Sequence, residues 1–275
     1  MSATHTRSQT HATKTIPLLY NPSVLGISRA PRNVAIIERI ALNDTENRIC
    51  ALLVDVANYL NDTRPQGHPK LTLRIAGGWV RDKMLGLESH DLDIALDTLM
   101  GFEFAQAGGS GGGIVGSIAK IDSNPEKSKH LETATAKVFG QMVDFVNLRT
   151  ETYREDSRIP QMEFGTPTQD ALRRDITINA LFYNLHTREI EDFTTLGKSD
   201  LRAGHIRTPL PPLQTFLDDP LRILRVIRFA SRFHFSIEPE ILRVCREDAG
   251  VRAALGTKIS RERIGVEVDK MLRAR

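Results

Sequence analysis

A glycine pair between two regular elements constrains this chain more than any other feature. Residues 71–76 are apolar enough to predict a short strand, and residues 79–87 predict a helix of one or two turns. Gly77 and Gly78 lie between them. Without a Cβ, the backbone at this turn can approach a ligand closely, and the helix that follows supplies N–H donors. The segment therefore favours binding of a triphosphate.

Two aspartates follow in a segment that alternates acidic and apolar residues. Asp91 and Asp93 are two apart in the predicted strand 91–96, so both carboxylates should project from one face. Paired hard oxygen ligands suit Mg²⁺, and two such ions can activate a 3′-hydroxyl and neutralise departing pyrophosphate. Alone, each short match favours a tight turn or a solvated edge strand. Together, with Arg81 and Asp82 between them, they favour a metal and phosphate site.

The segment LRRDITINAL is a second candidate. Arg173 and Arg174 offer planar guanidinium groups for phosphates, and Asp175 can accept from a ribose hydroxyl. An ordinary ion-paired helix start explains the same residues equally well.

The segment LDDPLRILRVIRFASRF predicts a helix begun by Asp218 or Asp219. Asp219 lies beside Arg222 on a basic stripe that continues through Arg225 and Arg232. Such a stripe is usually a solvated face with local ion pairs. Here the acid and the arginine can also read a base, because a carboxylate accepts from an exocyclic amino group and a guanidinium donates to ring acceptors. Cytosine and adenine present that combination, whereas uracil and guanine do not.

The order of the expected helices and strands predicts a mixed α/β domain followed by an all-α domain, with the boundary near residue 210. A helix is expected over 38–60 and a strand over 137–149, and nearly everything after residue 218 has a helical pattern that breaks at 235–239. The glycine-rich stretch 101–116 predicts a mobile loop or linker, and residues 154–169, with two prolines, predict a loop. We assign 1–37 as a basic extension, 38–209 as the α/β domain and 210–275 as the helical domain.

Composition excludes several classes of protein. No apolar run is long enough to cross a bilayer, and Cys50 and Cys245 lack the spacing of metal ligands. The first 37 residues hold basic residues but no Asp or Glu. Two interpretations stay open for this segment, a mitochondrial transit peptide and a disordered tail. We expect an intracellular protein that is located in mitochondria, in the cytoplasm and nucleus, or in all three.

These segments together resemble the class II tRNA nucleotidyltransferases, the CCA-adding enzymes of the polymerase-β-like superfamily, and the resemblance is close to the fungal members. It rests on RIAGGWVRDKMLG, SHDLDIA, NPEKSKHLETAT, VDFVNLR, ALRRDITINALFYN, FLDDPLRILRVIRFASRF and KISRERIGVE, which follow in family order over most of residues 70–275. It implies a polymerase-β-like head with a mixed sheet and flanking helices, and an all-α neck.

The resemblance also implies a role for each matching position. Asp91 and Asp93 would hold catalytic Mg²⁺, and Asp144 would be a third carboxylate. Asp219 and Arg222 would select CTP or ATP in place of a nucleic-acid template. The triphosphate would be contacted by Gly77, Gly78, Arg81 and Arg174, and the ribose by Asp175. Arg225 would lie near the phosphates.

The expected activity is Mg²⁺-dependent addition of CCA to the 3′ end of tRNA from CTP and ATP, with no membrane association and no obligate protein partner. Two alternatives remain, a poly(A) polymerase with the same head motifs and an inactive RNA-binding fragment. The chain departs from the family pattern at 101–116 and lacks the family's C-terminal body and tail after Arg275. We therefore expect a C-terminally truncated enzyme. In the second domain, Glu267 is expected to hold helices together rather than to contact substrate.

Overall fold

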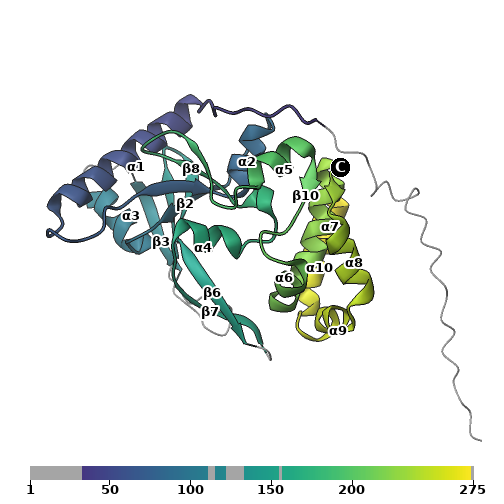
Figure 1. Ribbon diagram of the computed structural model, residues 1–275. Helices are drawn as coiled ribbons and strands as arrows, with labels where there is room; N and C mark the ends of the chain where they lie inside the picture. Colours follow the sequence, from purple (N-terminus) through teal and green to yellow (C-terminus); the bar gives the residue numbers. More distant parts are fainter. Residues whose placement is uncertain (1–32, 111–114, 122–132, 155–156, 274–275) are drawn as a thin grey trace, which may run out of the picture.

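The computed structural model describes residues 33–110, 115–121, 133–154 and 157–273 (Figure 1). Its centre is a seven-stranded sheet of order β3-β4-β5-β2-β1-β8-β9. The strands are β1 Leu73–Ala76, β2 Leu92–Leu96, β3 Val115–Ile121, β4 Thr133–Val138, β5 Gln141–Asn147, β8 Leu181–Asn184 and β9 Ile190–Asp192. Only the β2–β5 pair within this sheet is parallel. The sheet is mixed, as predicted.

Helix α1 (Asp44–Thr63) packs its apolar side into the core of the sheet domain. It begins later than the predicted residue 38 because Asn43 and Glu46 form a reciprocal capping box, with both hydrogen bonds at 2.9 Å. Glu46 also accepts from the Trp79 indole at 3.3 Å and pairs with Lys83 Nζ at 2.9 Å. These contacts fasten α1 to α2 (Gly78–Met84), the short helix that follows the glycine pair.

The predicted loop at 101–116 is wrong for its first part, because α3 spans Gly101–Ser110. The apolar residues that precede the glycines supply a buried side for this helix, and the ring of Phe104 lies 5.5 Å from that of Phe145 on β5. Gly101 also needs to be glycine, since a Cβ there would lie 2.6 Å from the Phe145 carbonyl oxygen. Residues 111–114 lie outside the described residues, and β3 starts at Val115.

Two further predictions are wrong. One expected a continuous strand where the chain makes a turn, and the other expected a loop where two strands pair. The single strand predicted over 137–149 is the end of β4, a turn and β5, since Phe139 and Gly140 both have positive φ, of 48° and 87°. The loop predicted over 154–169 is mostly a hairpin of β6 (Arg149–Arg154) and β7 (Ser157–Phe164). Pro160 is accommodated where the register of this two-stranded ribbon shifts.

The β6–β7 hairpin is a separate sheet that projects from the α/β part (Figure 1). It is followed by α4 (Pro167–Leu172), which Thr166 and Gln169 cap with a second reciprocal box. A 3₁₀ turn (Thr177–Asn179) then leads into β8. These elements place the LRRDITINAL segment against the glycine turn, because Gly77 N–H donates to the carbonyl oxygen of Leu181 at 2.9 Å.

The described chain after residue 218 is mostly helical, as predicted. After α5 (Gly197–Ala203), the helices are α6 Pro212–Asp218, α7 Leu221–Phe233, α8 Pro239–Glu247, α9 Ala249–Thr257 and α10 Arg261–Arg273. The expected break after α7 is confirmed, since His234 is left-handed with φ of 55°. There β11 (Ser236–Ile237) pairs with β10 (His205–Ile206) and ties the helices to the α/β part.

Helix α10 contacts α7 through charged groups. Its buried residue is Glu267, whose carboxylate accepts from Arg228 Nε at 2.7 Å and lies 3.8 Å from Arg225 Nη1. The expected structural role of Glu267 is thus confirmed. Within the described residues, none of the helices has the length and apolarity that crossing a bilayer would require.

Candidate active site

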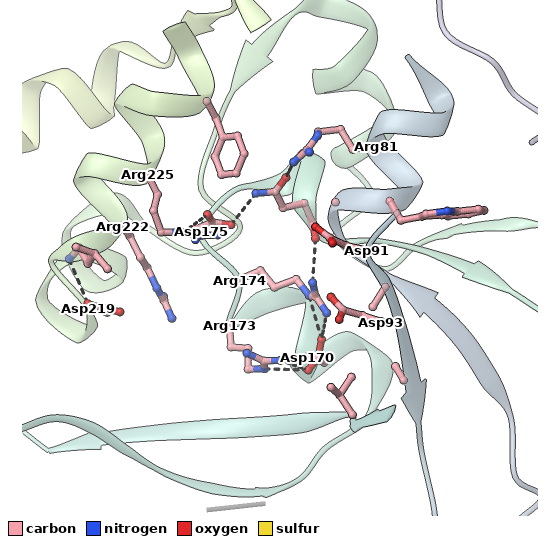
Figure 2. Close-up of a pocket in the computed structure, with 18 of the residues that line it drawn as sticks. Arg81, Asp91, Asp93, Asp170, Arg173, Arg174, Asp175, Asp219, Arg222 and Arg225 are labelled. Carbon is pink, nitrogen blue, oxygen red and sulfur yellow. Dashed lines mark hydrogen bonds and ion pairs between the residues drawn. The ribbon is translucent and has the colours of Figure 1, made fainter. Parts of the chain in front are cut away.

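A cleft of about 630 Å³ lies between the α/β part and α7 (Figure 2). Every residue to which the family resemblance assigns a role in catalysis or nucleotide binding lines it, except Gly77 and Asp144. Arginine is its commonest charged residue. The arginines are Arg81, Arg149, Arg173, Arg174, Arg222, Arg225, Arg228, Arg232 and Arg263. So many guanidinium groups around one cavity favour a polyanionic ligand.

The glycine turn forms one end of the cleft. Gly77 has φ of 76° and ψ of −125°, a conformation that residues with a side chain seldom adopt. A Cβ on Gly77 would also lie 2.7 Å from Arg174 Nη1. A Cβ on Gly78 would make only ordinary contact with Arg81, at 3.5 Å. Packing within the chain therefore requires glycine at 77, whereas Gly78 leaves backbone open to the cleft.

The carboxylates lie on the neighbouring strands. Asp93 on β2 is directly opposite Asp144 on β5, and Asp91 comes immediately before β2. Asp91 and Asp93 face the cleft beside Arg174 (Figure 2). Asp144 does not line it and instead accepts from Thr135 Oγ1 at 2.6 Å. The described part of the chain contains no group of three or more His, Cys, Asp or Glu arranged to hold a metal.

The environment of Asp93 is nevertheless that of a carboxylate close to others. The pKa of Asp93 is raised to about 6, mainly by burial and in smaller part by the charges of Asp144 and Asp91, against the opposing effect of Arg174. A cation bound among these groups would remove the repulsion and favour the ionised form. The oxygen donors therefore fit a hard divalent ion.

Arg174 is held rigidly between the carboxylates and α4. Its Nε and Nη2 donate to one oxygen of Asp170 at 3.0 and 2.8 Å, and its Nη1 donates to the carbonyl oxygen of Asn179 at 3.2 Å. Its guanidinium also lies 5.2 Å from the Phe182 ring. Figure 2 shows it pointing between Asp93 and Asp170. This arginine is oriented before any ligand binds.

A continuous hydrogen-bond chain crosses the back of the cleft. Arg81, itself paired with Asp82 at 2.7 Å, donates to the side-chain oxygen of Asn179. The Asn179 amide donates in turn to Asp175 at 3.1 Å, and the other Asp175 oxygen accepts from Arg225 Nε at 2.7 Å. Burial by itself raises the pKa of Asp175, but the Arg225 charge and these hydrogen bonds outweigh it, and the pKa is lowered. Asp175 is therefore ionised and fully engaged.

Asp219 and Arg222 occupy the opposite wall, at the start of α7 (Figure 2). One Asp219 oxygen accepts from the Leu221 backbone N–H at 3.1 Å, and the other accepts from Arg263 of α10 at 2.9 Å. Arg222 lies 3.5 Å from Glu151 of the β6–β7 hairpin. Each member of the pair thus has a counter-ion from a different element.

The residues of this cleft that sequence reasoning missed include Glu151, Asp170, Asn179 and Arg263. Asn179 and Arg263 both lie inside segments that we had singled out, but their partners are distant in sequence and no local pattern identifies them. Glu151 gave no signal, because its importance comes from Arg149, Arg173 and Arg222 converging on it.

Comparison with known proteins identifies the architecture. Residues 73–207 match the family model of the poly A polymerase head domain. The chain is 53% identical over 266 residues to the mitochondrial CCA tRNA nucleotidyltransferase of Saccharomyces cerevisiae, covering 94% of this chain and 48% of that protein. It thus spans about half the length of this curated relative.

Two solved structures agree with this match. A CCA-adding enzyme in an apo form superposes with a TM-score of 0.69 at 28% identity, over 85% of this chain and 50% of the other. The Thermotoga maritima CCA-adding enzyme complexed with tRNA superposes with a TM-score of 0.64 at 26% identity, over 92% and 50%. Residues 73–207 therefore belong to the poly(A) polymerase head-domain family, and the chain as a whole is similar to the CCA-adding tRNA nucleotidyltransferases.

Proposed function

We propose that this chain transfers CMP and AMP from CTP and ATP to the 3′-hydroxyl of tRNA, in the order C, C, A, with release of pyrophosphate. The observation that carries the proposal is the arrangement across one arginine-lined cleft. Asp91 and Asp93 lie on one side, and Asp219 and Arg222 lie on the other. The first pair suits phosphoryl transfer and the second pair suits recognition of a base.

We propose Mg²⁺ as the cofactor, held by Asp91 and Asp93. Asp144 would be a third carboxylate nearby, since it lies opposite Asp93 in the sheet. When bound, the ion would lower the pKa of the attacking hydroxyl and neutralise charge on the phosphates. Arg174 would help hold the carboxylates in position, because it lies beside Asp93 and is itself fixed by Asp170.

The triphosphate would lie along the glycine turn. Gly77 and Gly78 allow its close approach, and the guanidinium groups of Arg81, Arg174 and Arg225 supply positive charge around it. Asp175 would reach the ribose. Because Asp175 already accepts from Arg225 and Asn179, a ribose hydroxyl would have to share these oxygens.

Base choice would be made by Asp219 and Arg222. A carboxylate oxygen accepts from the amino group of cytosine or adenine, and the guanidinium donates to ring acceptors. Uracil and guanine place a carbonyl where the amino group should be, which leaves a carboxylate facing an acceptor. This wrong pairing is costly because two acceptors then face each other without a hydrogen bond.

We further propose that 38–209 forms the head and 210–275 the helical neck. The tRNA 3′ end would be the macromolecular partner, with no obligate protein partner. The mitochondrial relative supports a mitochondrial share, and cytoplasmic and nuclear shares remain part of the proposal. Imaging this chain in cells with a fluorescent tag fused after residue 275 tests this distribution. Absence from all three compartments would contradict it.

The activity is tested with the purified chain, Mg²⁺, labelled CTP and ATP, and tRNA that lacks CCA. Ordered incorporation of C, C and A is the expected result, and Asp91→Ala should abolish it. Asp55→Ala, an exposed aspartate on α1, is the matched control and should retain activity. Tailing with ATP alone would identify a poly(A) polymerase instead. RNA binding without incorporation would show that this chain is a binding fragment.

A further inference from the structure

A second hollow, of about 580 Å³, opens beside the cleft. It is lined by Thr45, His90, Asp91, Phe139, Gly140, Gln141 and Met142. Among the described residues, Asp91 is the one that lines both this hollow and the arginine-rich cleft. The carboxylate therefore stands at the border between two spaces of different chemistry.

The sheet register explains why the hollow opens there. Leu92 of β2 is opposite Val143 of β5 in a parallel pair, so Asp91 lies next to Met142. Gln141 Nε2 donates to the carbonyl oxygen of His90 at 3.2 Å, which ties the segment before β2 to the start of β5. The positive-φ turn at Phe139 and Gly140 also lines the hollow.

The lining of the hollow is suited to a nucleobase rather than to a triphosphate. The Met142 side chain points away from the core, and the residue is 55% exposed although it is apolar. The guanidinium of Arg48, an exposed residue of α1, lies 4.2 Å from the centre of the Phe139 ring. Apolar and aromatic groups beside a cation can contact any base face and its backbone phosphate, so binding would tolerate different sequences.

Nucleotidyl transfer needs two substrates that meet at the carboxylates, one from each side. The arginine-rich cleft would take the incoming nucleotide, which leaves the other side of Asp91 for the strand that is extended. We infer that the hollow binds the 3′-terminal nucleotide of the acceptor RNA, with its base against Met142 and Phe139 and its 3′-oxygen directed at Asp91. This inference rests on the proposed function and adds the location of the acceptor.

Kinetics with separate substrate titrations test the inference. Met142→Ala and Arg48→Gln should each raise the KM for tRNA lacking CCA by about 5-fold or more, the range for losing one base contact. The KM for CTP and the order of addition should not change. Tyr59→Ala removes an apolar side chain that is 63% exposed on α1 and should leave both constants unchanged. Unchanged tRNA KM in both Met142→Ala and Arg48→Gln would overturn the inference.

Cross-linking gives a readout that does not depend on turnover. The full chain is mixed with RNA whose 3′-terminal base is 4-thiouridine, irradiated, and mapped by mass spectrometry. Attachment to the peptide that contains residues 139–142 is expected, and attachment only to helices α8–α10 would contradict the acceptor site. If wild-type protein binds and cross-links at 139–142 but incorporates nothing, the proposed activity fails while the acceptor site stands.

Discussion

The Arg263 guanidinium of α10 donates to the carboxylate of Asp219 at 2.9 Å, across 44 positions of sequence. The carboxylate that we propose to read the base is therefore held by a cation from another helix. One turn further along α10, Glu267 binds Arg228 of α7 at 2.7 Å. Helix α10 is thus bound at two points, to Asp219 before α7 and to Arg228 within it, through side chains of opposite charge. This arrangement makes Arg263 a positioning residue for Asp219.

Replacing Arg263 should loosen base selection more than it slows chemistry. Arg263→Ala removes a hydrogen bond to a charged group, and we expect the preference for CTP over UTP in kcat/KM to fall about 10-fold. Arg263→Lys should restore part of it. Arg261→Ala, at an exposed position on the same helix, is the control. Equal losses for CTP and UTP would show that Arg263 only stabilises the fold.

Direct removal of the base-reading groups should have a larger effect of the same kind. Asp219→Ala or Arg222→Ala should relax nucleotide choice by about 10-fold or more, because each bidentate base contact contributes about 1–3 kcal/mol of discrimination. Misincorporation of UTP and GTP, measured with single nucleotides, checks this. If both variants keep the wild-type ratio of C to U addition, the template assignment is wrong.

The effect of replacing Gly77 can be distinguished from that of replacing a glycine whose only constraint is its positive φ. Gly77→Ala should cost about 1–3 kcal/mol of backbone strain and also displace Arg174, so activity should fall sharply. Gly67 has φ of 98° but open space around its missing Cβ, so Gly67→Ala carries the strain alone. Urea unfolding and turnover of the two variants decide the matter. Similar losses of activity would mean that the contact with Arg174 is unimportant.

Removing the carboxylate of Asp175 from the cleft is expected to destabilise the fold. Asp175→Ala leaves Arg225 and Asn179 without their shared partner, and we expect a loss of about 3 kcal/mol in the free energy of unfolding. The value is at the lower end for buried pairs because the Arg225 side chain is 33% exposed. Adding Arg225→Met to this variant should restore part of the lost free energy of unfolding, because the unpaired charge is then removed. Asp175→Ala with wild-type stability would contradict the assignment.

The protein should lose stability in mild acid through His186. Its Nε2 accepts from the Leu73 N–H at 3.2 Å, so the ring must be neutral. Burial, with the charges of Lys70 and Arg74, lowers the pKa of His186 below its ordinary value of 6.5. The unfolded chain therefore binds a proton first as pH falls below 6.5, and stability is lost down to the lowered pKa of the folded state.

The measurement for His186 is urea unfolding between pH 7.5 and pH 5. His186→Gln keeps an acceptor but does not titrate, so its stability should vary less with pH than that of the wild type. His68→Gln, at an exposed position, should follow the wild type. If the stability of His186→Gln varies with pH as that of the wild type does, His186 is not the cause of the loss of stability in mild acid.

Local pattern was enough to predict the elements that carry the site. The strand before Gly77, the helix after Gly78 and the start of α7 all depend on alternation, helical spacing and breakers, which act over a few residues. Their observed bounds differ from the predicted ones by only a few positions. The predictions failed where tertiary packing outweighed local conformational preference. Glycine content at 101–116 predicted a loop, but Phe104 gains enough from packing on Phe145 to hold α3.

The sequence by itself determined the mixed sheet, the helical second part and the chemical types of the candidate residues. Tertiary structure alone decided their partners. It set Asp93 opposite Asp144, placed Arg263 on Asp219 and brought Met142 beside Asp91. The physical reason is distance along the chain. Patterns record which face a residue occupies on its own element, whereas ion pairs and shared cavities arise only when separate elements pack together.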